Sequence, residues 1–258
     1  MTEAVGTARW TGTSLSGLLQ EAGIADGAVD VIFTGVDHGI ERGHEQDYQR
    51  ALPLADAMDD GLMLAYEMNG APLLPQHGAP LRLIVPGWYG MAHVKWLRRI
   101  TVVAEPFDGF QMQAYQFRDS LDDPGIPLTR IEPRALLIPP GFPDFMSRRR
   151  VVRSGDVLIE GRAWSGWAEV TAVQISIDGG DTWESADLDP GLDSYGWARW
   201  SWIWKAEPGS YLLSARATDA SGRTQPLGQR WSRGGFANNT IQKIRVAVIS
   251  SEMSVIAR

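Results

Sequence analysis

The sequence predicts an α+β domain followed by an immunoglobulin-like β-sandwich. Residues 8–103 mix helical and strand patterns, whereas the pattern from residue 151 onward is strand throughout. Between these two parts, residues 107–150 are rich in proline and show little hydrophobic periodicity, which is typical of a connection. We place the domain boundary near Arg134, so that residues 1–133 form the first domain and residues 134–258 the second.

The first domain carries both helix and strand signals. Residues 11–23 combine Ser/Thr capping residues with leucines at helical spacing, and Gly23 supplies a stop signal. A second helix is expected over residues 53–60, with Pro53 at its first position. Asn69-Gly70 suits a type I′ hairpin turn. Strands are expected over residues 31–34, 81–86 and 99–103.

The second domain is predicted to consist of short strands separated by turns. The turn signals are Asp178-Gly179-Gly180, Pro208-Gly209 and Ser221-Gly222. Short strands at this spacing favour a β-sandwich of immunoglobulin type. The expected strands are residues 157–164, 170–177, 183–188, 198–205, 210–219 and 241–249.

Charge and composition argue against several classes of function. The 258 residues carry a net charge of −7, so no general attraction to nucleic acid or to an anionic membrane is expected. No apolar stretch is long enough to span a bilayer, and the N-terminus lacks a signal-peptide core. The absence of cysteine excludes disulfides, thiolate-bound zinc and iron–sulfur clusters. We expect a cytoplasmic protein, or a periplasmic or exported one if an N-terminal signal has been lost.

The first candidate binding segment is HGAPLR, residues 77–82, which runs on into LIVPG. If residues 81–85 form a strand, Leu81, Leu83 and Val85 share one face and Arg82 points to the other. An arginine in so apolar a run needs a partner. One interpretation is that His77 and Arg82 hold an anionic group such as phosphate. The alternative, which these residues alone favour, is an arginine paired with a local carboxylate.

The second candidate segment is PGWYGMAHVKWLRRI, residues 86–100. Gly87 and Gly90 allow the backbone to approach a ligand closely. Consecutive loop amides can then bind an anion, with His93 and Lys95 adding donors and charge. The alternative is an aromatic loop packed on the core with Lys95 in solvent, and both interpretations stay open.

The third candidate segment is GVDHG, residues 35–39. Its Asp37 follows a short strand, where a carboxylate can accept hydrogen bonds from a polar heterocycle; the alternative is a turn-forming aspartate. The histidines have spacings that match no standard metal site, so no protein-only metal site is predicted. They are His38, His44, His77 and His93.

Taken together, these segments resemble the sulfite oxidase family of molybdopterin enzymes. The resemblance covers nearly the whole chain. It implies an α+β molybdopterin-binding domain, N-terminally incomplete, followed by an immunoglobulin-like domain that usually mediates homodimerisation. The matching stretches are TARWTG (7–12), GVDHG (35–39), LAYEMNGAPLLPQHGAPLRLIVPGWYGMAHVKWLRRI (64–100), IEGRAWSG (159–166), ISIDGGDTW (175–183), RATDASGRTQP (216–226) and the closing RWSRGGFANNTI.

The resemblance also implies a molybdenum cofactor bound through its pterin, and an oxygen-atom transfer that typically oxidises sulfite to sulfate. Tyr115, in FQMQAYQF, matches the family's active-site tyrosine, which helps to position the substrate; the alternative is a half-buried tyrosine in the connection. No haem-binding or flavin-binding segment is apparent, so electrons are expected to pass to a separate acceptor such as a cytochrome. By motif position, the expected pterin and phosphate contacts are Asp37, His77, Arg82, His93, Val94 and Lys95.

The sequence departs from the family pattern on the metal side. In the family, a cysteine upstream of the segment that begins TARW binds molybdenum, and this sequence contains no cysteine. Basic substrate-binding residues of that upstream region are also missing, and the family's C-terminal substrate arginine aligns with Gly234 or Arg233. Since a soft thiolate stabilises high-valent molybdenum, its loss should impair oxygen transfer even where the pterin binds.

Three hypotheses follow from the match and its departures. The first is a sulfite-oxidase-type enzyme whose N-terminal portion is missing. The second is a short paralogue that uses the old pterin pocket for another anionic ligand. The third is a non-catalytic module that dimerises or binds a partner. Stoichiometric molybdenum in the purified protein would exclude the second and third hypotheses.

Overall fold

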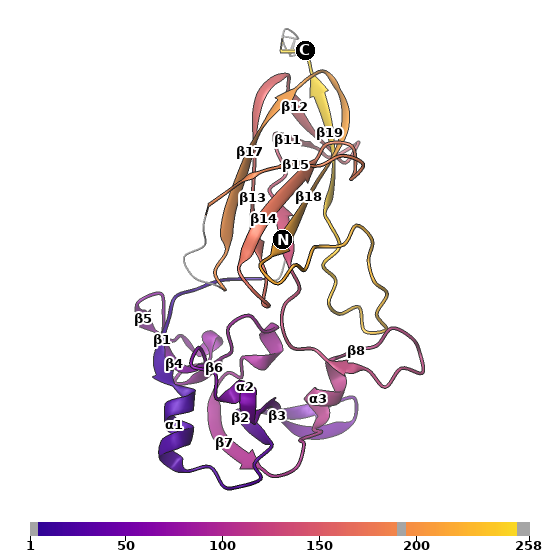
Figure 1. The fold of residues 1–258 in the computed structure, drawn as a ribbon. Coiled ribbons are helices and arrows are strands. Elements are labelled where there is room, and N and C mark those ends of the chain that lie inside the picture. Colours follow the sequence, from indigo (N-terminus) through magenta and orange to yellow (C-terminus); the bar gives the residue numbers. More distant parts are fainter. Residues whose placement is uncertain (1–4, 190–194, 252–258) are drawn as a thin grey trace. The chain divides into compact units, whose positions relative to one another are not determined.

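The computed structural model describes residues 5–189 and 195–251 (Figure 1). The chain divides into two compact units. Unit 1 comprises Met1–Arg130 and Trp231–Ala237, and unit 2 comprises Ile131–Arg230 and Asn238–Arg258. A short segment near the C-terminus therefore returns to unit 1 after the chain has formed most of unit 2.

The described part of unit 1 contains two small antiparallel sheets that contribute to one core, and a separate two-stranded sheet formed by Gln116–Phe117 and Ile126–Pro127 (Figure 1). The strands predicted at residues 31–34 and 99–103 are confirmed as parts of β2 (Asp30–Glu41) and β7 (Leu97–Val103). The strand predicted at residues 81–86 is shorter, β6 (Arg82–Ile84), and β3 (His44–Pro53) is not among the predicted strands. In the first sheet, β2 (Asp30–Glu41) lies between β3 (His44–Pro53) and β7 (Leu97–Val103). In the second, β4 (Met63–Met68) pairs with β1 (Trp10–Ser14), β5 (Ala71–Pro72) and β6 (Arg82–Ile84).

The predicted first helix is confirmed as α1 (Leu15–Ala22). The Ser14 hydroxyl accepts a hydrogen bond from the Gly17 backbone N–H at 3.2 Å, and Gly23 ends the helix with a φ of 77°. The other helical segments are short: α2 (Leu54–Ala57), η1 (Pro75–His77), η2 (Gly90–Ala92) and α3 (Phe110–Ala114). Only 10% of the structure is helical, so the α+β expectation is met by little more than α1.

The hairpin between β4 and β5 has the turn that its sequence predicts. Asn69 and Gly70 have φ values of 55° and 79°, which is the left-handed pair that a type I′ turn requires. No helix among the described residues combines the length and apolar character needed to cross a lipid bilayer.

The core of unit 1 confirms the predicted alternation along β6. Leu83 and Val85 are fully buried, Leu81 packs against the same cluster, and the intervening Arg82 is not part of it. Leucines from α1, β3 and β4 complete this core. Consequently β6 and the loop that follows it pack against the core of unit 1 through Leu83, Val85 and Val94.

Unit 2 is a sandwich of two sheets. One sheet has the order β10-β13-β17-β16 and the other the order β11-β12-β19-β18-β14-β15. All pairings are antiparallel except that of β12 with β19. The strands are β10 (Arg134–Leu137), β11 (Phe142–Asp144), β12 (Arg149–Arg153), β13 (Gly155–Trp164), β14 (Val170–Ser176), β15 (Glu184–Ser185), β16 (Asp187–Leu188), β17 (Ala198–Ala206), β18 (Gly209–Asp219) and β19 (Lys243–Ile249).

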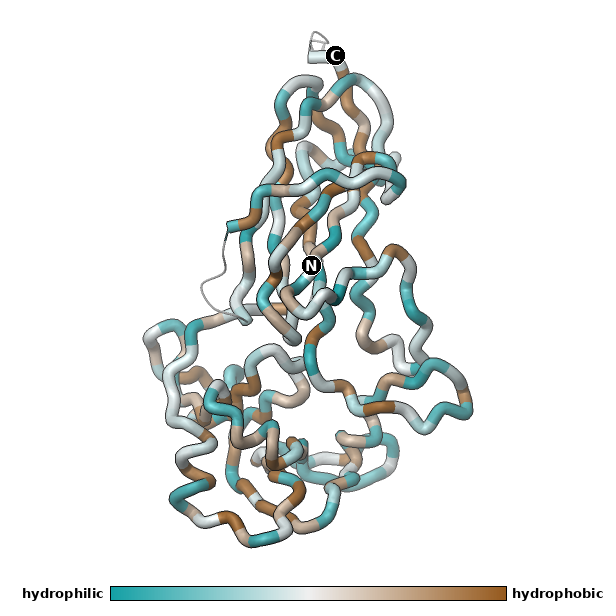
Figure 2. The backbone as a smooth tube through the Cα atoms, in the orientation of Figure 1, coloured by the Kyte–Doolittle hydropathy of each residue, from teal (hydrophilic) through white to brown (hydrophobic). Residues whose placement is uncertain are grey.

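Alternating burial along the strands builds the core of unit 2. Along β17, for example, Ala198, Trp200, Trp204 and Ala206 are buried, and residues between them are more exposed. Figure 2 shows the corresponding alternation of hydrophobic and hydrophilic residues along the sandwich strands. Five of the six predicted strands of the second domain are therefore confirmed. The strand predicted at residues 183–188 is instead two two-residue strands, β15 and β16, which belong to different sheets.

The proline-rich connection is more regular than the sequence predicts. Residues 107–150 contain α3, β8 (Gln116–Phe117), β9 (Ile126–Pro127), β10 and β11. The expectation of an irregular connection is wrong for residues 134–144, because β10 pairs with β13 and β11 pairs with β12. The partner of β10 lies far along the chain, and β11 is a three-residue strand in a hairpin with β12, so neither leaves a clear local periodicity.

Candidate functional site

Arg82 is held by backbone carbonyls and an indole ring. Its guanidinium donates to the carbonyl oxygens of His77 at 2.9 Å and of His93 at 3.4 Å. The guanidinium carbon lies 4.9 Å from the ring centroid of Trp10. The expected local carboxylate partner is wrong, since no ion pair involves Arg82 in the described part of the chain. Its Nε is buried and has no hydrogen-bond partner there.

His93 fixes the loop that follows β6. The backbone N–H of Val85 donates to Nδ1 at 3.3 Å, and Nε2 donates to the carbonyl oxygen of Trp88 at 3.3 Å. This pattern requires a neutral imidazole with its proton on Nε2. Burial lowers the pKa of His93 to about 4. Because both ring nitrogens are engaged, a ligand contact by His93 would use its backbone.

The buried His93 should make the protein less stable in mild acid. Between about pH 6.5 and pH 4 the unfolded chain binds a proton at this position and the folded chain does not, so the free energy of unfolding falls as the pH falls. The full effect is about 3 kcal/mol. Urea unfolding at pH 7 and pH 4.5 measures it, and His93→Gln should show a smaller pH dependence than the wild type. The exposed His44→Gln is the control; identical pH dependence in all three proteins would contradict the assignment.

Asp37 presents a buried acceptor next to Lys95. It lies in β2 at a shift in the β2–β3 register, and its Oδ1 is buried with no hydrogen-bond partner among the described residues. Burial raises the pKa of the Asp37 carboxyl, and its own backbone N–H and the charge of Lys95 oppose the rise. Lys95 Nζ donates to the carbonyl oxygen of Gln76 at 3.1 Å and lies 4.4 Å from the Trp96 ring centroid.

Two glycines allow these groups to come together. A Cβ atom at Gly35 would overlap Asp37 Oδ1 and lie 3.0 Å from the carbonyl oxygen of Lys95. A Cβ atom at Gly78 would lie 2.8 Å from Lys95 Cβ, and the φ of 99° at Gly78 also favours glycine. Arg82 belongs to the same surface, because its Nη1 donates a hydrogen bond to the carbonyl oxygen of His77. We call Asp37, Arg82, Lys95 and the backbone of residues 76–78 and 93–96 the polar wall.

Val94 contributes to the polar wall through its backbone alone. Its side chain is fully buried in the core of unit 1. The backbone N–H of Leu83 donates to its carbonyl oxygen at 2.8 Å, which ties the wall to β6. A ligand contact at Val94 would therefore be a main-chain contact.

Tyr115 belongs to a second cluster, which we call the Tyr115 cluster and which comprises Tyr48, Arg50, Tyr115 and Phe236. The Tyr115 ring centroid lies 5.4 Å from that of Phe236 and 6.0 Å from the Arg50 guanidinium carbon. Arg50 is 1% exposed, and its Nη1 donates to the carbonyl oxygen of Gln111 at 2.7 Å. Tyr48 donates to the carbonyl oxygen of Met91 at 2.7 Å, and burial raises the pKa of Tyr48 to about 12.

The segment Trp231–Ala237 brings Phe236 into this cluster. The Arg233 backbone N–H donates to the carbonyl oxygen of Arg118 at 2.9 Å, and Arg233 Nη1 donates to that of Leu121 at 3.3 Å. Arg233, one of two residues that align with the family's substrate arginine, thus anchors the returning segment.

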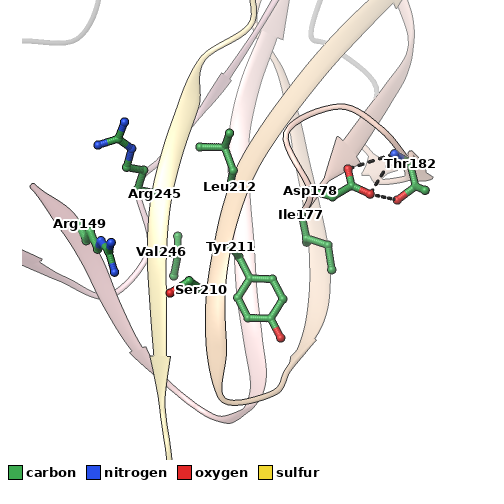
Figure 3. Close-up of a pocket in the computed structure, with 9 residues that line it drawn as sticks. All are labelled: Arg149, Ile177, Asp178, Thr182, Ser210, Tyr211, Leu212, Arg245 and Val246. Atoms are coloured by element: carbon green, nitrogen blue, oxygen red, sulfur yellow. Dashed lines mark hydrogen bonds between the residues drawn. The ribbon is translucent and has the colours of Figure 1, made fainter.

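A separate hollow lies on unit 2 (Figure 3). It has a volume of about 550 Å³ and contains none of the predicted site residues. Asp178 on one side is satisfied by hydrogen bonds, including that from the Thr182 backbone N–H at 3.0 Å. The exposed Arg149 and Arg245 lie on the other side, on β12 and β19. It is an open surface feature without buried unpaired donors, so the polar wall and the Tyr115 cluster are the stronger candidates.

The comparisons with known proteins define the class. Residues 1–111 match the oxidoreductase molybdopterin binding domain, and residues 144–249 match the Mo-co oxidoreductase dimerisation domain. The chain therefore belongs to the molybdopterin oxidoreductase family that includes sulfite oxidases and nitrate reductases. The molybdenum cofactor is the cofactor of this family.

Individual relatives come from both branches of the family. The chain is 34% identical to mitochondrial sulfite oxidase of Mus musculus over 96% of its own length and 48% of the relative. It is 30% identical to nitrate reductase [NADH] 1 of Oryza sativa subsp. japonica over 95% of its length and 30% of that protein. The crystal structure of the sulfane dehydrogenase SoxCD from Paracoccus pantotrophus matches with a TM-score of 0.75 and 27% identity, covering 92% of this chain and 59% of that one. The chain thus spans about half the length of the sulfite oxidase that it matches.

The sequence pattern does not mark Tyr48 and Arg50 as site residues. Both lie on β3, and residues at this spacing share one face of a strand. The segment HEQDYQRALP mixes charged residues with apolar ones, so the period-two signal of a strand is weak in it. Because Arg50 follows several polar residues in this segment, the sequence gives no sign that its side chain is buried.

Proposed function

We propose that this chain forms the cofactor-binding wall and the dimerisation domain of a molybdenum-cofactor oxidoreductase that oxidises sulfite or a related sulfur oxyanion by oxygen-atom transfer. The bound cofactor supplies the oxygen-atom and electron transfer. The electrons then pass to a separate acceptor such as a cytochrome, and the sandwich pairs two copies of the chain. The sulfite oxidase relative and the SoxCD neighbour support the choice of a sulfur substrate.

The observation that carries the proposal is the pair of unpartnered polar atoms on the polar wall. Asp37 Oδ1 is a buried acceptor and Arg82 Nε a buried donor, and neither has a partner in the described protein. Molybdopterin has N–H donors on its pterin ring and a phosphate at its other end, so it needs both an acceptor and a cationic donor from the protein. Buried polar atoms of native proteins are nearly always satisfied, which favours a polar ligand here. The residues therefore fit the cofactor: Asp37 would hold the ring, while Arg82 and Lys95 would hold the phosphate.

Cofactor binding and turnover need separate tests, because the sequence contains no cysteine to supply the family's thiolate ligand. Turnover is measured with the purified protein, sulfite and ferricyanide or cytochrome c as acceptor. We expect acceptor reduction that depends on sulfite. Nitrate reduction with no response to sulfite would assign the chain to the nitrate reductase type. A purified protein that contains neither pterin nor molybdenum but binds another anionic ligand would support a repurposed paralogue.

Gly35→Ala should lower the pterin content with little loss of stability. The new methyl group would overlap Asp37 Oδ1, and the carboxylate can rotate away at low cost, but this removes the acceptor from its place. Pterin released by oxidation is measured by fluorescence against protein concentration. Gly39→Ala is the matched control, because a Cβ atom there meets nothing within 4 Å. Equal pterin content in both variants would contradict the role of Asp37.

Tyr115→Phe should lower turnover by roughly a hundredfold while the cofactor stays bound. The Tyr115 ring centroid lies 6.0 Å from the guanidinium carbon of the buried Arg50, so its hydroxyl is a donor that could position an oxyanion near a cation. The ring contact with Phe236 survives the change. The initial rate of sulfite oxidation and the pterin content are measured together. The exposed Tyr66→Phe serves as control. Unchanged sulfite oxidation in Tyr115→Phe would refute the assignment.

A further inference from the structure

Arg50 is a buried cation without an anionic partner. It is 1% exposed, and no ion pair involves it among residues 5–189 and 195–251. Its Nη1 is satisfied by the carbonyl oxygen of Gln111, but its Nε is buried and has no hydrogen-bond partner. One end of the guanidinium is therefore closed by protein, and the Nε edge is left without an acceptor.

Such an arrangement is unfavourable in the absence of a ligand. Burial lowers the pKa of Arg50, but an arginine side chain keeps its charge in proteins. An ionised group that is neither paired nor fully hydrogen-bonded costs several kcal/mol when buried. A neutral carbonyl from Gln111 offsets only part of this. The guanidinium therefore needs a negative charge at its buried, unpartnered Nε edge.

The groups around Arg50 select the kind of anion. The groups that interact electrostatically with the Arg50 guanidinium are the phenols of Tyr48 and Tyr115, which are hydrogen-bonding groups and not anions. Tyr48 already donates to Met91, so its hydroxyl proton is used. The Glu41 carboxylate accepts a hydrogen bond from Gln111 Nε2 at 3.4 Å and forms no ion pair with Arg50. Tyr115 is thus the neighbouring donor that can share an anion with Arg50.

The geometry points to Arg50 as a binding residue for a small oxyanion of the sulfite or sulfate type, held between its Nε edge and Tyr115. This deepens the proposed function, because it names the residue of this chain that would hold the substrate. The planar guanidinium fork matches two oxygens of such an anion. The polar wall consists of other residues, with Asp37 on β2 and Arg82 on β6, whereas Arg50 lies on β3.

The experiment uses inorganic sulfate as the probe and thermal unfolding of the purified protein as the readout. Ionic strength is held constant with chloride. We expect a saturable rise of about 5 °C in the wild-type Tm with sulfate. Arg50→Met, which removes the charge but keeps most of the volume, should be at least as stable as the wild type in chloride and should not respond to sulfate. The exposed Arg99→Gln should respond like the wild type.

Several results would overturn the inference. A wild-type Tm that does not respond to sulfate, or a shift of equal size in Arg50→Met, would show that Arg50 binds no anion. A shift that persists in Arg50→Met and is lost in Arg82→Ala would place the sulfate on the polar wall instead. Arg50→Met unfolding at far lower temperature than the wild type in chloride would indicate a purely structural arginine.

The kinetic readout tests the link to the proposed function. Arg50→Lys keeps the charge but loses the fork, so we expect the KM for sulfite to rise roughly tenfold with kcat little changed. Sulfate binding does not require turnover. If sulfite is not oxidised but sulfate binding depends on Arg50, the proposed reaction is wrong and the anion site is supported. If sulfite oxidation is normal in Arg50→Lys and sulfate does not change the Tm, the anion site is wrong and the proposed reaction is supported.

Discussion

Replacing Arg82 by alanine should remove most of the pterin and molybdenum from the purified protein. The side chain supplies the buried Nε donor of the polar wall, and its other nitrogens hold the carbonyls of His77 and His93 in place. Losing a charge-assisted contact and the order of two loops should weaken binding roughly a hundredfold. Molybdenum is measured by mass spectrometry and pterin by fluorescence after oxidation.

Arg99→Ala is the matched control, because this arginine lies on β7 of the same unit and is exposed. Arg82→Lys should give an intermediate content, since it keeps the charge without the fork. Full loading of Arg82→Ala would contradict phosphate recognition by this residue. A circular dichroism spectrum equal to the wild type's is needed to show that unit 1 still folds.

Gly161→Ala should strongly destabilise unit 2. Gly161 lies on β13 between β10 and β17, and a Cβ atom there would overlap both the carbonyl oxygen of Leu136 and the ring of Trp200. Trp200 is 1% exposed and cannot move aside without disturbing the core. We expect a loss of about 3 kcal/mol in the free energy of unfolding.

Thermal unfolding checks this prediction, and the Tm should fall by about 6 °C or more. Gly228→Ala is the control, because a Cβ atom there meets nothing within 4 Å. If Gly161→Ala and Gly228→Ala unfold at the same temperature, the result would contradict the close approach of β10 and of the Trp200 ring to Gly161.

The sequence predicts those parts of the fold that depend on local chemistry. The Ser14 cap, the Gly23 stop and the Asn69-Gly70 turn each follow from the preferences of single residues, and all three are present. The strands of the sandwich follow from alternation that burial on one face imposes. The local pattern is insufficient for β10, whose partner β13 lies far along the chain. It is also insufficient for β3 and β11, which form hairpins with the neighbouring strands β2 and β12 but mix polar and apolar residues.

The candidate site divides in the same way. Asp37, Arg82 and Lys95 lie in short motifs, and their chemistry can be anticipated from glycine and basic residues near strand ends. That His93 would use both ring nitrogens to hold its own loop depends on folded geometry. Arg50 is informative only because it is buried without a carboxylate, and burial of one residue on a charged strand is a tertiary property.

The central claim is that the polar wall holds the pterin of a molybdenum cofactor. Its most direct test is the amount of pterin released per chain from protein purified from a host that makes the cofactor. The account predicts stoichiometric pterin in the wild type and in Gly39→Ala, and a large loss in Gly35→Ala and Arg82→Ala. Folded wild-type protein without pterin, or equal pterin in all four proteins, would contradict it.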